Sequence, residues 1–247
     1  MALPCTAPTR VRVKNASWGL VPLASIVLVV VAIRQDAGAA AMLTYLSLAA
    51  VPPLAALALA GGVRCGSRGL AVLVVPLFAV AWVERSNLAG QAAAVILSIL
   101  ACVTLAVVLT QLAPLRWLKI GILLTAVGDV AMIGAHYLQP AQDLLNFATP
   151  GFDLPAFQRV LLSGVVMGFG DFFVAALLGA VLAAEGCRYQ DRAALITFAM
   201  AVVFDLLFIA MPVLPATVPV AIALLVVERR AGRRRAQPSY GVSTATG

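Results

Sequence analysis

Two aspartates stand inside long apolar runs of the sequence, where an ionisable side chain is costly. Asp129 lies in the run from about 117 to 138, and Asp171 lies in the run from about 160 to 184. A carboxylate near the centre of a membrane-length run costs roughly 2.5–3.5 kcal/mol on insertion scales, so it needs a partner or a function. If both runs are antiparallel helices, the helical rise puts Asp129 roughly 13 Å and Asp171 roughly 16 Å below the same membrane surface. We therefore predict that the two acids meet.

Two facing carboxylates can catalyse hydrolysis by acid–base chemistry. They do not both ionise at close range, so the pair holds one proton. The ionised member takes a proton from water while the protonated member polarises the scissile carbonyl. The sequence leaves open which aspartate is the acid and which is the base, and in a coupled pair the roles are shared.

Small residues surround the second aspartate, and a third aspartate stands in a later run. Gly164, Gly168, Ala175 and Gly179 recur with Asp171 at helical spacing, which lets a neighbouring helix approach closely in lipid. Asp205 lies in the run from about 193 to 211 and could be a structural hydrogen-bonding residue, a member of a proton relay, or a rival for a catalytic role. We favour the structural role because no glycine stripe accompanies Asp205.

The composition excludes a soluble domain. The chain is 63% hydrophobic and only 11% charged, with a mean hydropathy of +1.04, whereas soluble proteins are near half apolar and a quarter charged. Apolar runs of spanning or near-spanning length predict an all-α polytopic membrane protein with about eight transmembrane helices. These runs lie at about 18–33, 39–61, 69–83, 88–113, 117–138, 160–184, 193–211 and 213–227.

The basic residues indicate how these helices cross the membrane. With the N-terminus in the cytoplasm, only Arg34, Arg85 and Arg159 of the 17 lysines and arginines fall outside, so 17 − 3 = 14 remain inside. This bias is what the positive-inside rule requires, and it predicts that both termini are cytoplasmic. The first run could instead be a cleavable signal peptide ending near Ala39, but its apolar core is long and Arg34 interrupts it. Cleavage would leave the orientation of the other helices unchanged.

Three segments are predicted along the chain. Residues 1–115 form four scaffold spans, residues 116–230 form four catalytic spans that belong to the same structural unit, and residues 231–247 form a basic, disordered cytoplasmic tail. An outer loop at about 139–159 is long enough to be a lid or a substrate-receiving segment, and an ordinary solvated connection is equally open. Three prolines at the start of the eighth run remove backbone donors, which favours a backbone that lines a cavity: Pro212, Pro215 and Pro219.

Cofactors and nucleic acid are not indicated. The chain has four cysteines without a Cys-x-x-Cys pair and a single histidine, His136, which argues against a disulfide framework and a zinc site. We expect no cofactor and no metal. The net charge of +7 comes mostly from loop anchors and the basic C-terminal cluster, so membrane lipid is an expected partner and nucleic acid is not.

The last four spans, residues 117–228, resemble the GxGD intramembrane aspartyl proteases, the family of presenilin and signal peptide peptidase. Gly168-Phe169-Gly170-Asp171 is similar to the Gly-x-Gly-Asp segment of that family, Asp129 matches the aspartate one helix earlier, and Leu214-Pro215-Ala216 resembles the proline-alanine-leucine motif. The resemblance implies that Asp129 and Asp171 are catalytic and that five residues shape the site or bind substrate: Gly168, Gly170, Leu214, Pro215 and Ala216. It implies transmembrane or signal-peptide helices as substrates.

The chain also departs from that family. Gly128 stands where a tyrosine usually precedes the first aspartate, Thr217 stands where the last motif has leucine, and eight spans replace nine. The charge bias places the loop between the aspartates outside, which resembles the orientation of signal peptide peptidases and implies substrates with a cytoplasmic N-terminus. We expect a multi-pass protein of a prokaryotic cytoplasmic membrane; substrate identity and oligomeric state do not follow from the sequence.

Two other functions compete. The segment from Met167 to Ala180 also resembles the prepilin peptidases, membrane aspartyl proteases with a related motif, although Phe173 replaces their lysine and their Cys-x-x-Cys pairs are missing. Outside the proteases, buried acids and broken helices also mark proton-coupled transporters. No repeat relates the two halves of the chain, and the first four spans contain no acid, so we rank the transporter below the protease. A non-catalytic membrane scaffold ranks third because it leaves the buried acids unexplained.

Overall fold

The protein is mostly helical, as the hydropathy pattern predicts. The computed structural model describes residues 20–36, 38–62, 67–135, 144, 148–162, 165–186, 190–207 and 217–236. In this part of the chain each of the eight apolar runs contains or overlaps one α-helix. These are α1 (Val21–Gln35), α2 (Gly38–Leu57), α3 (Val74–Val83), α4 (Leu88–Leu112), α5 (Leu115–Gly134), α7 (Phe169–Glu185), α8 (Gln190–Leu207) and α9 (Thr217–Ala236). A π-helical turn η2 (Ala58–Gly62) extends α2, and a 3₁₀ helix η3 (Arg68–Leu73) leads into α3.

Three of the described helical segments are long and apolar enough to cross a membrane: Gly38–Gly61, Leu88–Leu112 and Leu115–Gly134. Two shorter apolar helices cover Val21–Gln35 and Arg68–Val83. Large apolar side chains are exposed on the outer helix faces, among them Leu28, Met42, Val83 and Phe198. Such a surface is compatible with a lipid environment, whereas a soluble monomer rarely exposes so much contiguous apolar area. The full count of eight spans stays a prediction.

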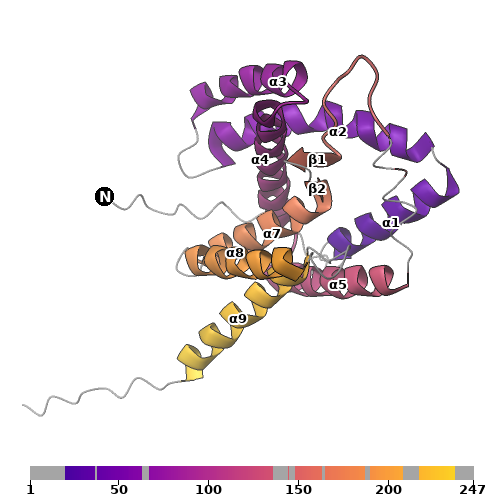
Figure 1. Cartoon of the computed structure of the whole chain (residues 1–247). Helices are drawn as coiled ribbons and strands as arrows, with labels where there is room; N and C mark the ends of the chain where they lie inside the picture. The colour runs from indigo at the N-terminus through magenta and orange to yellow at the C-terminus, as the bar shows by residue number, and fades with distance from the viewer. Residues whose placement is uncertain are drawn as a thin grey trace, which may run out of the picture.

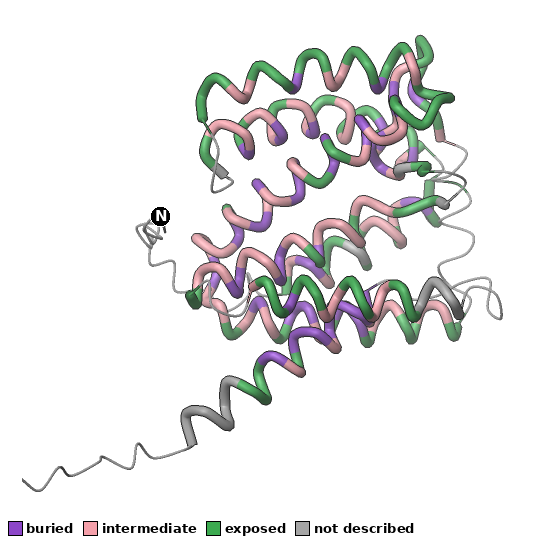
Figure 2. Tube along the Cα trace, turned by 60° about the vertical axis from the view of Figure 1, so that its left-hand side comes forward, coloured by how far each residue is buried: buried purple, intermediate pink, exposed green. Residues whose placement is uncertain are grey.

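Helix α4 is central because it packs against α2 and α3 and also against α7 (Figure 1). One apolar core joins α2, α3 and α4, and a second joins α4 with α5, α7, α8 and α9. Figure 2 shows buried positions on the inward faces of these helices and exposed positions on the outermost ones. The predicted scaffold and catalytic segments are therefore packed on each other through α4 and α7.

The run from 160 to 184 is not one helix, which corrects the prediction. An antiparallel hairpin of β1 (Arg159–Leu162) and β2 (Val165–Gly168) comes first, and α7 begins only at Phe169. Valine favours strands, and each glycine in a helix interior costs about 1 kcal/mol, so the glycine-rich first half of this run is a poor helix. The expected all-α fold thus contains a β-hairpin. Gly168 does not share a helical stripe with Asp171, and the depth estimate for Asp171 fails.

The described part of the outer loop, residues 148–158, is attached to the scaffold helices. The Gly151 backbone N–H donates a hydrogen bond of 3.1 Å to the Tyr45 hydroxyl on α2. Arg85, between α3 and α4, forms a 2.7 Å ion pair with Asp153. Phe157 is fully buried and lies against Phe78, with ring centroids 6.1 Å apart. These contacts tie this half of the loop to the first four helices.

The C-terminal end also differs from the prediction. Helix α9 continues to Ala236, so it includes residues 231–236 of the expected tail. The basic cluster therefore begins on a helix rather than after it.

Candidate active site

Asp129 lies near the end of α5, five residues before Gly134. The hydroxyl of Thr217 donates a 2.8 Å hydrogen bond to Asp129 Oδ2, and the Thr217 backbone N–H also interacts with this carboxylate. Thr217 is buried and is the first residue of α9. The carboxylate of Asp129 therefore lies at the positive end of the α9 dipole, where a negative charge is favourable.

Asp171 also lies at the start of a helix, in this case its own. It is the third residue of α7, and its Oδ2 accepts a 3.2 Å hydrogen bond from the Gly168 backbone N–H at the helix start. This is the carboxylate half of a capping box, which satisfies a backbone donor that the helix itself leaves unpaired. Both acids are thus held by backbone donors at the start of a helix.

The structure brings these two acids together. Asp171 is half-buried and lies close enough to Asp129 for the two negative charges to repel each other. α5 and α7 pack against each other, and both pack against α9, which supplies Thr217. Two carboxylates in this arrangement repel as a dianion, so they are suited to sharing one proton.

The two glycines of the predicted motif have different surroundings. A Cβ on Gly168 would lie 3.4 Å from Asp171 Oδ2, whereas a Cβ on Gly170 would meet nothing within 4 Å. A side chain at 168 would therefore make an ordinary van der Waals contact with the carboxylate, whereas Gly170 leaves open space at the start of α7.

Several predicted residues fall outside this description. Leu214, Pro215 and Ala216 lie outside the described residues, as does His136. Asp205 lies on α8, but its side chain is also outside the description, so its role stays a prediction.

Thr217 and Gly128, the two positions that differ from the motifs the sequence resembles, each make a contact in the structure. Thr217 supplies a hydroxyl to Asp129, which leucine has no group to provide. A Cβ on Gly128 would lie 3.0 Å from Leu23 Cδ1 of α1, so a larger residue at 128 would have to displace the end of the Leu23 side chain. The sequence marks both positions as unusual but carries no signal for the contact that each makes.

An open apolar pocket of ≈ 370 Å³ lies between α1 and α5. Met132, three residues after Asp129, contributes to the wall from α5. The α1 side is formed by Val27, Val30, Val31, Arg34 and Gln35. Neither aspartate lines the pocket, and Met132 stands about one helical turn beyond Asp129.

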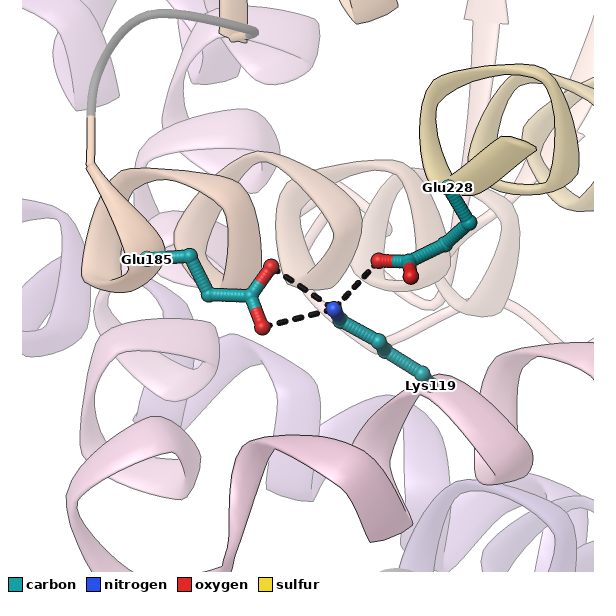
Figure 3. A network of polar contacts seen from close by, with 3 residues as sticks. All are labelled: Lys119, Glu185 and Glu228. Carbon is teal, nitrogen blue, oxygen red and sulfur yellow. Dashed lines mark hydrogen bonds and ion pairs between the residues drawn. The ribbon is translucent and has the colours of Figure 1, made fainter. Parts of the chain in front are cut away.

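A second polar cluster, which sequence reasoning missed, lies at the opposite end of the same helices (Figure 3). Lys119 on α5 forms ion pairs with Glu185 on α7 and with Glu228 on α9. These charges stand near the ends of apolar runs, where the sequence analysis treated Lys119 only as a topology signal. Their separation along the chain gave no sign that they meet.

Among the described residues, no group of three or more His, Cys, Asp or Glu side chains is arranged to hold a metal ion. The groups that the described site offers are two carboxylates, a threonine hydroxyl and backbone N–H groups. Compared with protein-family models, with curated proteins and with solved structures, the chain matches none of them.

Proposed function

We propose that this protein is an intramembrane aspartyl protease that hydrolyses peptide bonds within transmembrane or signal-peptide helices. One observation carries the proposal: Asp129 and Asp171, from two apolar helices that pack against each other, lie within electrostatic reach of each other. Keeping both of these close, half-buried acids ionised costs free energy, so the pair favours holding one proton. Acid–base hydrolysis needs one protonated and one ionised carboxyl group.

In the proposed mechanism the aspartate pair holds one proton. The ionised carboxylate takes a proton from the attacking water, and the protonated carboxyl polarises the scissile carbonyl. The hydrogen bonds from Thr217 and Gly168 each fix one carboxylate oxygen and thereby orient the other. Preorganised groups of this kind lower the barrier because they do not have to reorient during the reaction.

A helical substrate hides its carbonyls, so it must unwind before cleavage. The Gly168 N–H donates to Asp171 and therefore points away from β1. Hydrogen bonding alternates along an antiparallel pair, so the Val166 N–H faces the same outer edge of β2. That edge, which no other described strand covers, leads directly to Asp171. We propose that the unwound substrate adds to β2 as a strand.

The proposed arrangement in the membrane has eight spans, with both termini in the cytoplasm of a prokaryotic cell. The charge bias of the loops supports it. The two aspartates then lie toward the outer ends of α5 and α7, and the apolar pocket between α1 and α5, about one helical turn beyond Asp129, would receive side chains of the substrate.

Substitution of the acids tests the proposal. In purified protein reconstituted into vesicles, Asp129→Asn and Asp171→Asn should each abolish cleavage of a reporter helix, because an amide does not take up the proton. Asp191→Asn, an exposed acid at the start of α8, is the matched control and should cleave normally. If both single variants still cleave the reporter, the protease proposal fails, and a proton-flux assay on the same vesicles would test the transporter.

A further inference from the structure

Lys119, Glu185 and Glu228, here called the ion cluster, tie three helices together at the end away from the aspartates (Figure 3). The Lys119 ammonium donates to both Glu185 carboxylate oxygens, at 2.6 and 2.7 Å, and to Oε1 of Glu228. The Lys119 side chain is 16% exposed, while the Glu185 and Glu228 side chains are 39% and 44% exposed. One shielded cation therefore holds two half-exposed carboxylates from different helices.

Each helix that contributes to the ion cluster also contributes one residue to the candidate active site. Lys119 and Asp129 share α5, Glu185 and Asp171 share α7, and Glu228 and Thr217 share α9. The separations of 10, 14 and 11 residues correspond to about 15, 21 and 17 Å of helix. The ion cluster thus joins at one end the three helices that must meet at the other.

The apolar packing between these helices does not by itself fix how far one slides past another. The core between them consists of Leu, Ile, Val and Ala side chains, such as Leu118, Leu177 and Leu224. Such contacts are non-directional, and in lipid they are not reinforced by a hydrophobic driving force. Ion pairs and hydrogen bonds with defined geometry are the contacts that set register.

We propose that Lys119 is a positioning residue: through Glu185 and Glu228 it fixes the axial register of α5, α7 and α9, so that Asp171 and Thr217 meet Asp129. Partly exposed ion pairs contribute little to overall stability, so the expected role is in alignment rather than in folding. The consequence for cleavage rests on the proposed function, but the alignment itself does not.

Cross-linking measures the alignment without any cleavage assay. Asp129→Cys and Thr217→Cys are combined in a chain whose four native cysteines are replaced by alanine, and a short bis-methanethiosulfonate reagent joins the two thiols. Adding Lys119→Met should slow this reaction about tenfold, because a slip toward the next turn moves one thiol by up to about 5.4 Å. Lys119→Arg keeps the charge and should react at nearly the original rate. Arg116→Gln removes an exposed charge one turn away on α5 and is the matched control.

The same substitutions are then made in the chain that keeps both aspartates. Lys119→Met should lower kcat about 10- to 100-fold with little change in KM, since a misplacement of about 1 Å can cost that factor. Lys119→Arg should restore most of the rate, and the thermal melting temperature should stay close to that of the unaltered protein in all variants. A purely structural lysine would instead lower the melting temperature and leave kcat per folded molecule unchanged.

If the Lys119→Met protein does not fold and accumulate, a charge-exchange variant tests the proposal instead. Lys119→Glu combined with Glu185→Lys keeps one lysine and two glutamates on the same helices, and it should restore rapid cross-linking. Slow cross-linking in the folded exchange variant, or rapid cross-linking in folded Lys119→Met, would overturn the proposal. If cross-linking depends on Lys119 but the unaltered protein cleaves no reporter, the alignment role stands and the protease function fails.

Discussion

At the scale of single residues, the site depends on hydrogen bonds that come from helix starts. Thr217 begins α9 and donates to Asp129, and Gly168 precedes α7 and donates to Asp171. Each aspartate therefore has a fixed donor outside its own helix. The donor to Asp129 belongs to α9, and the donor to Asp171 is the last residue of β2. A carboxylate held in this way keeps one orientation, which a reaction that moves protons between two acids requires.

Thr217→Val tests the hydroxyl, because valine keeps the shape of threonine and removes the donor. A hydrogen bond to a charged group is worth about 1.5–3 kcal/mol, so we expect kcat to fall about tenfold or more while KM changes little. Thr217→Ser keeps the hydroxyl and should retain most of the activity. Equal kcat values for the valine and serine variants would show that the hydroxyl does not orient Asp129.

Gly170→Ala tests the open space at the start of α7. The added methyl group meets nothing in the free protein, and alanine is the better helix former by up to about 1 kcal/mol, so stability should hold or rise. Cleavage should fall because the methyl group enters space that the substrate backbone needs. Gly134→Ala on α5, which also meets nothing, is the control and should cleave normally. Unchanged kcat/KM in the Gly170 variant would mean that substrate does not approach there.

At the scale of elements, the hairpin is the feature that the sequence did not reveal. A short apolar run without clear alternation does not distinguish a strand from a buried helix, so the pattern from 160 to 168 predicts a continuation of the following helix. The eight helices could be predicted from the sequence because long apolar runs are hard to accommodate outside apolar helices. The depth argument predicts that Asp129 and Asp171 meet. The two acids are close, but the argument is wrong for Asp171, because a hairpin precedes α7 and Asp171 stands at the start of that helix.

Contacts between distant segments could not be predicted from the sequence in the same way. Lys119 meets Glu185 and Glu228 across 66 and 109 residues, and Thr217 meets Asp129 across 88. Such contacts depend on where each helix begins and how the helices slide against each other. One sequence contains no direct record of either, so it indicates Lys119 only as a topology anchor and Thr217 only as a departure from a motif.

Val166→Pro tests the outer edge of the hairpin. Proline removes the Val166 N–H, which points away from β1, and proline is tolerated on an edge strand. We expect a normal fold and a several-fold loss of kcat/KM, because the substrate strand loses one backbone hydrogen bond worth about 1 kcal/mol. Met167→Pro removes the N–H that faces β1 and should disrupt the hairpin and abolish cleavage. Normal kcat/KM with Val166→Pro would exclude strand addition at this edge.

At the scale of the whole molecule, orientation in the membrane connects the site to its substrates. The aspartates lie toward the end of the molecule where the described loop 148–158 is tied to α2 and α3. The ion cluster and the basic residues of α9 lie toward the other end. If the positive-inside rule holds, the first end faces outward and the second faces the cytoplasm.

Labelling of single cysteines determines this orientation in intact cells. Phe152→Cys places a thiol at a loop position that is 94% exposed, and Asp191→Cys places one at the exposed start of α8. A membrane-impermeant maleimide added outside should label the first variant and not the second until the membrane is opened. Labelling of the Asp191 variant alone would reverse the topology.

The orientation also predicts which helices are cleaved. The fold is chiral, so a strand added to β2 runs in one direction past Asp171, and turning the enzyme over in the membrane reverses the substrate that fits. With the loop between the aspartates outside, we expect cleavage of helices whose N-terminus is cytoplasmic, such as signal peptides and single-span anchors. Two reporters with the same helix in opposite orientations, reconstituted with the enzyme, measure this preference. Cleavage confined to the reporter with an outer N-terminus would contradict it, even if labelling places the loop outside.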